Sequence, residues 1–361
     1  MAKYDYHKEK KISQIETTNE IVASLPDFTK EFFLQYCRII RNMQERTITE
    51  YAKDIKVFFN YLLEKNPMAG SSLEDITIEM INCQSVKDLQ EFISSISSYK
   101  DANGIVRVNS PSGLNRKVAS LRSFYKYFYT TGDLTSNPAS ILAAPRIPRK
   151  NIIRLERDES DELINAVEDP SETLKNRRQA AWSERTKCRD KAIIVLLLGT
   201  GIRISECVGL SLKDINWTNR AMRVVRKGGD EQTIYFNKDI EEALLEYIKN
   251  ERTSPEDDVD ALFVSRNKTR MSVSAVERMV KKYAKEAVPQ KKITPHKLRA
   301  TFATELNKAN EGDLLQVSVA LGHSSIETVK KYADEADIDR QKVPSFTDWT
   351  HKSNAKDEKP Q

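Results

Sequence analysis

The segment "LGHSSIETVKKYA" brings two chemically useful side chains into one short unit. His323 can donate a hydrogen bond to a negatively charged oxygen, and Tyr332, nine residues later, carries a hydroxyl that can act as a nucleophile. Ser324 and Glu327 have the spacing of a capping box, which predicts a short helix over 325–333. By itself the segment is equally consistent with a packed tyrosine and a surface histidine.

A second candidate group lies in "LLLGTGIRISECVGL", where a buried apolar run ends in a glycine turn and Arg203 starts a new helix. Arg203 and Glu206 are three residues apart and share one face of that helix. An arginine fork binds phosphate through two hydrogen bonds, and the start of a helix favours anions. The alternative is an ordinary arginine–glutamate pair on the surface.

The segment "ITPHKLRATFATEL" places His296 and Arg299 on one face of another helix. Thr294 can cap this helix, and Pro295 suits its first turn. A histidine at the start of a helix tends to stay neutral, so His296 could accept a proton beside a phosphate held by Arg299. An exposed histidine–arginine pair explains the same spacing.

Lys227 lies at the tip of a hairpin predicted by "AMRVVRKGGDEQTIYF", over 221–236, and two glycines follow it. A lysine on a tight turn can reach into a cleft from outside. A solvated lysine is the alternative.

The chain of 361 residues is 39% hydrophobic and 31% charged, which is typical of a soluble globular protein, and its length predicts two domains. No apolar run approaches the ~18 residues that span a bilayer, and the N-terminus lacks the apolar stretch of a secretory signal. We therefore expect no membrane association. The four cysteines show no C-x-x-C spacing, which predicts neither a metal site nor a disulfide framework and fits a reducing cytoplasm: Cys37, Cys83, Cys188 and Cys207.

Composition divides the chain into five segments. They are a polar, partly disordered extension over 1–26, a helical domain over 27–143, a basic, proline-containing linker over 144–155, a mixed α/β domain over 156–344 and a polar tail over 345–361. In the second half, helices are predicted over 190–198, 203–210, 239–250, 274–287 and 295–309, with a further helix ending at Gly322 and a strand over 261–265.

Two helical patterns stand out in the first half, and 97–113 between them is predicted to be a loop. The first follows a capping box at Thr47 and Glu50, and the second is amphipathic with a basic outer side. Apolar residues repeat at intervals of three and four residues in both: Ile48, Tyr51, Ile55, Phe58 and Leu62 in the first, and Leu114, Val118, Leu121, Tyr125 and Phe128 in the second.

Basic residues concentrate between Lys100 and Lys150, a segment that contains nine lysines and arginines and two aspartates. That local excess of seven is larger than the net charge of +5 for the whole chain. Such a region is typical of a polyanion-binding surface, although a solvated helix face with a linker would look similar. The candidate DNA-binding residues are Arg116, Lys117, Arg122, Lys126, Arg146, Arg149 and Lys150.

The order of these elements closely resembles the tyrosine recombinase, or integrase, family: Arg203, the hairpin Lys227, His296-x-x-Arg299, Leu-Gly-His323 and Tyr332. The resemblance covers 156–345, and "SGLNRKVASLRSFYKYFY" and "NPAS" are similar to the family's helical DNA-binding domain. The Xer type of site-specific recombinase, particularly the single-recombinase type of Gram-positive bacteria, looks nearest.

This resemblance implies a mainly α fold with a small β-sheet or hairpin, in which a helical core-binding domain and a mixed α/β catalytic domain form a two-domain, C-shaped clamp on DNA. It also implies roles for each matching residue. Tyr332 would be the nucleophile, His296 the base, Lys227 the general acid, and Arg203, Arg299 and His323 the stabilisers of the phosphate, while Glu206 would orient Arg203 or His296. No metal, ATP or other cofactor is needed.

The resemblance further implies a double-stranded DNA partner with an inverted-repeat core site, a homotetramer on two such sites that is a monomer or dimer when free, and an FtsK-type DNA translocase as activator. The expected location is the cytoplasm, in association with the nucleoid. The expected task is resolution of chromosome dimers at a dif-like site. Alternatives are an integrase or excisionase of a phage or mobile element, a type IB topoisomerase, and a catalytically silent, sequence-specific DNA-binding protein.

Overall fold

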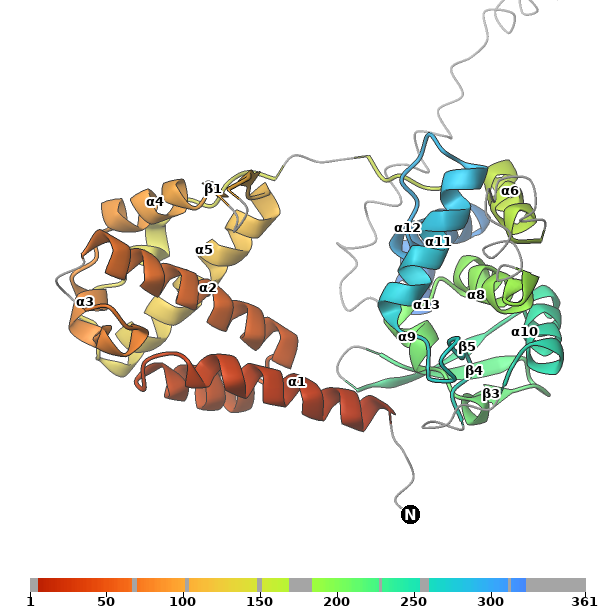
Figure 1. Cartoon of the computed structure of the whole chain (residues 1–361), viewed down its shortest axis with the longest axis horizontal. Coiled ribbons are helices and arrows are strands. Elements are labelled where there is room, and N and C mark those ends of the chain that lie inside the picture. The colour runs from red at the N-terminus through yellow and green to blue at the C-terminus, as the bar shows by residue number, and fades with distance from the viewer. Residues whose placement is uncertain are drawn as a thin grey trace, which may run out of the picture. The chain divides into compact units, whose positions relative to one another are not determined.

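The computed structural model describes residues 6–66, 70–100, 104–147, 151–168, 184–226, 229–253, 260–310 and 313–322. It divides into two compact units, an N-terminal unit up to residue 149 and a C-terminal unit from residue 150 (Figure 1). The division falls inside the segment 144–155, where the sequence predicts a linker. Helices dominate both units, and the strands form two small sheets, so the predicted mainly α fold with a small β-sheet is confirmed.

The N-terminal unit is a helical bundle with an aromatic core. Its elements are α1 (Tyr6–Ala23), η1 (Glu31–Ile40), α2 (Glu45–Lys65), η3 (Leu73–Asp75), α3 (Ile78–Asn82), α4 (Val86–Ser95), β1 (Ser98–Lys100), β2 (Val106–Val108), α5 (Pro111–Thr131) and η4 (Pro138–Ile141). Phe32, Phe58, Phe59 and Phe124 are fully buried between η1, α2 and α5. Both long helices predicted from the apolar spacing are confirmed as α2 and α5.

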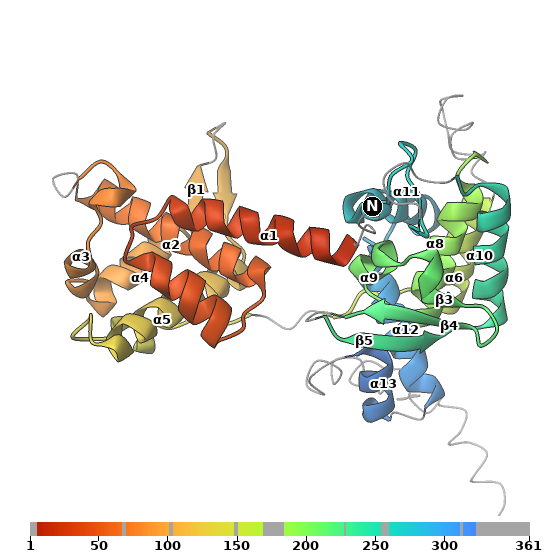
Figure 2. The ribbon, with the colours of Figure 1, turned by 90° about the horizontal axis from the view of Figure 1, so that it is seen from below.

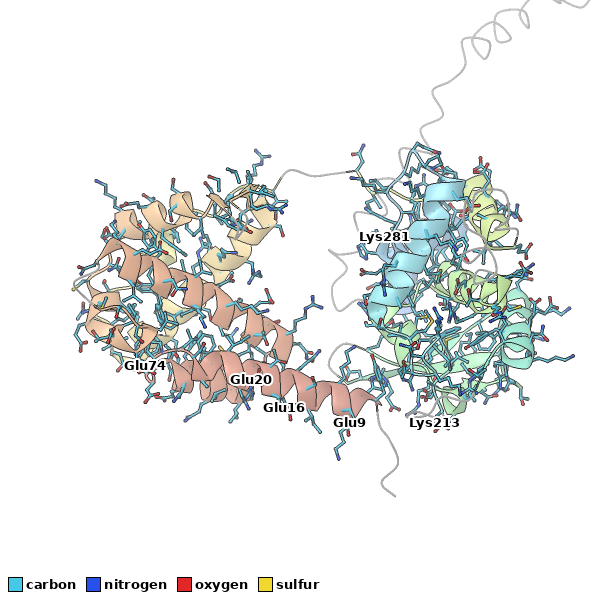
Figure 3. The ribbon with its side chains drawn as sticks, viewed as in Figure 1. Glu9, Glu16, Glu20, Glu74, Lys213 and Lys281 are labelled. Atoms are coloured by element: carbon cyan, nitrogen blue, oxygen red, sulfur yellow. The ribbon has the colours of Figure 1, made fainter. Side chains whose placement is uncertain are left out.

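The expectation of a partly disordered N-terminus is wrong for residues 6–23, which form α1. Thr18 and Val22 are buried against α2, and the Thr18 hydroxyl lies 2.7 Å from that of Thr49. Figure 3 shows the acidic side chains Glu9 and Glu16 along the outer side of the same helix. The face of α1 that packs against α2 carries Thr18 where an apolar residue would be expected. The three- and four-residue apolar spacing that predicts a helix is therefore interrupted in this part of the sequence.

Two further local predictions for the N-terminal unit are corrected. Within 97–113, strands β1 and β2 pair antiparallel with Tyr99 opposite Arg107, instead of forming a loop. Each strand is only three residues long and β2 is exposed throughout, so no alternating pattern marks it. The helix α2 begins at Glu45, so Thr47 lies inside its first turn instead of capping it, and Glu45 forms an ion pair of 2.7 Å with Arg38.

The C-terminal unit combines helices with one small antiparallel sheet. Its elements are α6 (Arg157–Glu168), α8 (Lys187–Thr200), α9 (Ile204–Gly209), η5 (Leu212–Asp214), β3 (Ile215–Asn216), β4 (Ala221–Val225), β5 (Glu231–Tyr235), α10 (Lys238–Asn250), α11 (Val273–Ala287), α12 (Pro295–Ala309) and α13 (Leu314–Leu321). The sheet has the order β3-β4-β5, and Val225 pairs with Glu231 at the end of the β4–β5 hairpin where the chain turns from one strand to the other. Figures 1 and 2 show that this end of the hairpin points away from α10.

The predicted hairpin and the five predicted helices of this half are confirmed as β4–β5 and as α8, α9, α10, α11 and α12. The helix that was expected to end at Gly322 is α13. The helix α6 has no counterpart among the predicted elements.

The predicted strand over 261–265 is wrong. This segment is buried, but it contributes only single bridges, from Ala261 to Ser211 and from Val264 to Arg270. Side chains form the hydrogen bonds to the backbone of Val264 instead. Its amide donates to the Tyr247 hydroxyl at 3.1 Å, and its carbonyl accepts from the Arg189 side chain at 3.1 Å. Buried backbone groups need partners, but these need not be another strand.

The helix α8 is the centre of the C-terminal core. Ile193, Ile194, Leu196 and Leu197 are all buried, so this helix presents apolar residues on several sides. It packs against α6, α10 and α12, and its C-terminal end leads directly into the turn that carries Arg203. None of the described helices has the length and apolar character needed to cross a membrane.

Candidate active site

The turn between α8 and α9 requires glycine at position 201. Gly201 ends α8 with φ of +59°, in the left-handed region that favours glycine. A Cβ at this position would lie 2.2 Å from Cδ1 of Phe302, so the turn also packs tightly against α12. The tight turn delivers Arg203 to the N-cap position of α9.

Glu206 fixes Arg203 through both the side chain and the backbone. One carboxylate oxygen accepts from the Arg203 guanidinium at 2.8 Å, and the other accepts from the Arg203 amide at 2.8 Å. Glu206 itself is only 4% exposed, and the side chain of Arg203 is about one-third exposed. The expectation that the start of this helix would attract an external anion is therefore corrected, because the carboxylate of Glu206 already occupies it. The Arg203 side chain nevertheless stays partly exposed.

The second arginine comes from α12. Arg299 is 3% exposed and donates to the Gly201 carbonyl at 2.5 Å and to the Leu321 carbonyl at 2.7 Å. It therefore ties the α8–α9 turn to the end of α13. His296 lies one turn earlier on α12 and is exposed. Pro295 opens the helix as predicted, while Thr294 occupies the N-cap position without the expected side-chain hydrogen bond to the described residues.

The end of α13 is where these elements converge. Gly322 adopts φ of +59° and terminates the helix, as the sequence predicts. Its carbonyl lies 3.5 Å from a guanidinium nitrogen of Arg203, next to the Leu321 carbonyl that Arg299 binds. Both arginines thus meet the backbone immediately before His323.

Arg226 is a further buried arginine at this site, and the sequence interpretation missed it. It follows β4 directly and is 9% exposed. Its guanidinium donates to Glu206 at 2.7 Å, to the Gln232 side chain at 2.8 Å and to the Ala320 carbonyl at 3.3 Å. A signal was available: Met222 and Val224 are buried on one face of β4, and continuing this alternation places position 226 on the same face.

Five of the predicted site residues lie outside the described part of the chain: Lys227, His323, Tyr332, Arg149 and Lys150. Two of them adjoin residues that the structure does describe, since Lys227 follows Arg226 and His323 follows Gly322 in sequence. The site contacts given above bring Arg203, Glu206 and Arg299 together. The helix predicted over 325–333 and the tail over 345–361 also lie outside the described residues.

Comparisons with known proteins agree with this geometry. Residues 154–338 match the phage integrase family, and residues 31–132 match the N-terminal SAM-like domain of phage integrases. The tyrosine recombinase XerC of Caldanaerobacter subterraneus subsp. tengcongensis is 33% identical over 311 residues, which cover 84% of this chain and 81% of the relative. The tyrosine recombinase XerS of Streptococcus thermophilus is 30% identical over 345 residues, covering 88% of this chain and 94% of the relative.

The chain belongs to the tyrosine recombinase family. It is therefore an enzyme of the class that cleaves and rejoins DNA through a tyrosine intermediate. Two solved structures share its fold. The XerH recombinase in a post-cleavage complex with palindromic difH has a TM-score of 0.64 at 19% identity, covering 93% of this chain and 94% of that one. A lambda integrase dimer on a core site has a TM-score of 0.56 at 16% identity, covering 82% and 96%.

The predicted DNA-binding residues of the recombinase differ in the contacts that their side chains make within the protein. Arg116 and Lys117 approach Asp54, at 2.6 Å and 3.6 Å, and Arg122 donates to the Leu142 carbonyl at 2.6 Å. Burial raises the pKa of the Asp54 carboxyl, and the guanidinium of Arg116 offsets this only in part. Arg122, Lys126 and Arg146 are all exposed. The outer side of α5 is thus less uniformly basic than its sequence suggests, because Asp54 draws two cations inward.

The recombinase has another basic row that the sequence interpretation did not single out. Arg278, Lys281 and Lys285 are exposed and spaced by three and four residues, so they share one side of α11. Figure 3 shows Lys281 on the surface of this helix. The signal was present in "VERMVKKYAKE" as basic residues at helical spacing opposite the buried Val276 and Val280.

Proposed function

We propose that this recombinase uses Arg203 and Arg299 to bind the scissile phosphate and Tyr332 to attack it. The observation that carries the proposal is the convergence of both arginines on Leu321 and Gly322, directly before His323. A phosphate beside the partly exposed Arg203 would then lie near the segment that carries His323 and Tyr332. Removing one donor to such a charged group typically costs on the order of 10²–10³ in rate.

In the proposed reaction the Tyr332 hydroxyl oxygen forms a bond to phosphorus as its proton passes to His296. The bond from phosphorus to the 5′-oxygen breaks, and Lys227 protonates that oxygen, leaving a 3′-phosphotyrosyl link and a free 5′-hydroxyl. Attack by the 5′-hydroxyl of a partner strand reverses these steps and restores the tyrosine. Because ionising a tyrosine of pKa about 10 at pH 7 costs roughly 4 kcal/mol, a base beside Tyr332 is needed.

For the biological role we propose Xer-like recombination: resolution of chromosome dimers at a dif-like, inverted-repeat site by a homotetramer that assembles on two sites. The support is that the similar curated proteins are XerC and XerS, and that a structure of similar fold is XerH on difH. An FtsK-type translocase as activator and a cytoplasmic, nucleoid-associated location belong to the same proposal. Integration or excision of a mobile element is the alternative, since a transposon integrase shares the fold with a TM-score of 0.56.

Covalent trapping tests the chemistry. The recombinase is mixed with a nicked duplex that carries the presumed site from the DNA beside its gene, and the products are separated on a denaturing gel. We expect a slower, protein-linked DNA band that Tyr332→Phe abolishes. The matched control is Tyr235→Phe, because Tyr235 is an exposed tyrosine on β5 of the same unit and should leave the band intact.

The other outcomes separate the alternatives. Salt-sensitive binding with no covalent band, even with added translocase, would indicate a DNA-binding protein without catalysis. A covalent band with relaxation of one supercoiled duplex but no strand exchange between two duplexes would indicate a topoisomerase. Exchange at chromosomal sites but not at the ends of an element would support the Xer-like role over integration.

A further inference from the structure

Arg226 carries a buried charge, and burying a charged side chain costs free energy. Its side chain is 7% exposed and its ion-pair partner Glu206 is 3% exposed, so both charges have lost most of their water. Burying an ion pair seldom gains stability over apolar residues of similar size. The guanidinium is nevertheless retained, and it uses its fork to contact three different partners.

These contacts join four elements that meet at the site. Arg226 follows β4, binds Gln232 of β5, binds Glu206 of α9 and donates to the Ala320 carbonyl of α13. Gln232 adds a second bridge between β5 and α13, since its amide donates to the Val319 carbonyl at 3.1 Å. The hairpin is therefore fastened to the last turn of α13 from both of its strands.

Close packing at Gly322 shows how tightly this junction fits. A Cβ on Gly322 would lie 2.8 Å from Nε of Arg226 and 2.9 Å from its Cζ. The guanidinium thus lies directly against the residue that ends α13. Glu206 meanwhile shares its carboxylate between Arg226 and Arg203, so the same network also orients one of the phosphate-binding arginines.

We propose that Arg226 is a positioning residue for strand cleavage: it holds the hairpin that continues into Lys227 against the end of α13, which continues into His323. This inference rests on the proposed function, because it gives Lys227 and His323 the roles stated above. The backbone supports it, since the Arg226 amide donates to the Asp230 carbonyl at 2.7 Å and its carbonyl accepts from Gly229 at 3.1 Å. These two hydrogen bonds hold Gly229 and Asp230 beside Arg226, so the described backbone before and after Lys227 is joined.

The leaving group offers a readout that separates positioning from general damage. A duplex with sulfur in place of the bridging 5′-oxygen at the scissile phosphate releases a thiolate. A thiolate leaves readily without a proton, because a thiol (pKa about 8.5 in cysteine) is far more acidic than an alcohol. We expect Arg226→Ala to slow cleavage of the oxygen substrate about 10²-fold and of the sulfur substrate less than about 10-fold. Arg226→Lys, which keeps the charge but not the fork, should fall between wild type and Arg226→Ala.

The matched control is Arg189→Ala. Arg189 is another buried arginine of the same unit, with a side chain 10% exposed, and it binds Asp190 and Val264 rather than any site residue. Its loss should lower the melting temperature while leaving the ratio of oxygen to sulfur cleavage as in wild type. Equal slowing of both substrates by Arg226→Ala, or no slowing of either, would overturn the proposal.

Hydrogen exchange tests the geometry without catalysis. In Arg226→Ala we expect the amides of Gly229 and of the last turn of α13 to exchange about tenfold faster or more, with α8 and α10 unchanged. Unchanged protection at both places would refute the positioning role even if the enzyme were inactive. Absence of any covalent complex in the wild-type protein would count against the proposed function. The hydrogen-exchange result for Arg226→Ala would still show whether Arg226 holds the hairpin against α13, because it does not depend on catalysis.

Discussion

At the scale of single residues, Glu206 is the carboxylate that joins two arginines of the candidate site. It is buried, it accepts from the backbone and side chain of Arg203, and it is the ionic partner of Arg226. One acidic group therefore orients both the partly exposed Arg203 and the buried Arg226 of the hairpin. The sequence interpretation assigned Glu206 to Arg203 or His296, and the structure shows the contact with Arg203.

Glu206→Gln should be damaging in two ways. The amide keeps the shape but loses the charge, so Arg226 stays buried without a counter-charge and Arg203 loses its orientation. We expect the rate of covalent-complex formation to fall on the order of 10²-fold and stability to fall by about 3 kcal/mol. Single-turnover cleavage and urea unfolding measure the two effects.

The control for this variant is Glu241→Gln, which removes a charge from the more exposed pair between Glu241 and Arg220. Surface pairs contribute about 0–1 kcal/mol, so this variant should resemble wild type in both measurements. Glu206→Gln with wild-type rate and stability would show that the buried carboxylate is dispensable.

At the scale of elements, the loop before α12 is fastened to the first turn of α6. Lys291 donates to the Glu159 carboxylate at 2.6 Å and to the Arg154 carbonyl at 3.1 Å, and Glu159 also accepts from the Glu156 amide at 2.7 Å. Nearby, the Leu155 amide donates to the Thr301 hydroxyl of α12 at 2.9 Å. The segment that enters the C-terminal unit is thereby fixed to the helix that carries His296 and Arg299.

This anchor should make stability depend on pH in the acid range. Partial burial opposes ionisation of Glu159, but the hydrogen bonds from Lys291 and from the Glu156 amide outweigh it and hold the pKa of this carboxyl below its ordinary value of 4.5. The unfolded chain then takes up the proton more readily than the folded one. The contribution is therefore fully present above about pH 4.5 and is lost as the pH falls through the lower, folded-state pKa.

Glu159→Gln should accordingly destabilise the C-terminal unit by about 1 kcal/mol at pH 7, and the difference from wild type should close as the pH falls below the ordinary pKa. Thermal unfolding of both proteins across this range tests it. A stability difference between the two proteins that stayed constant, or widened, at the lowest pH measured would show that the ionised carboxylate does not provide the stabilisation.

At the scale of the whole molecule, affinity for DNA should come mainly from phosphate contacts spread over both units. The exposed candidates are Arg122, Lys126 and Arg146 in the N-terminal unit and the α11 row of Arg278, Lys281 and Lys285 in the C-terminal unit. Each contact made releases counterions, so the logarithm of the binding constant falls linearly with the logarithm of the salt concentration.

Removing two charges of the α11 row should reduce that dependence. We expect Lys281→Ala with Lys285→Ala to weaken binding of the presumed site and lower the salt slope by about 2. The matched control removes Lys238 and Lys249, which are exposed lysines of α10 in the same unit. Equal slopes for both double variants would place the α11 row outside the DNA-binding surface.

The sequence by itself determined the local elements and the order of the site residues. Helices with clear three- and four-residue apolar spacing, such as α2 and α5, follow from the sequence because each residue's neighbours along the helix decide them. The spacing of His296 and Arg299 likewise fixes that they share a side of α12. The resemblance built on that order identified the family before any contact was known.

The tertiary structure decided which of these groups meet. Arg299 reaches the Gly201 carbonyl across 98 positions, and Arg226 reaches Glu206 across 20, and no local pattern encodes contacts at such separations. The docking of α1 is another case, since its threonine-bearing face is recognisable as a packing face only once α2 is beside it. A buried charge at position 226 is stable only because three chain segments bring acceptors to it, and that condition exists only in the folded protein.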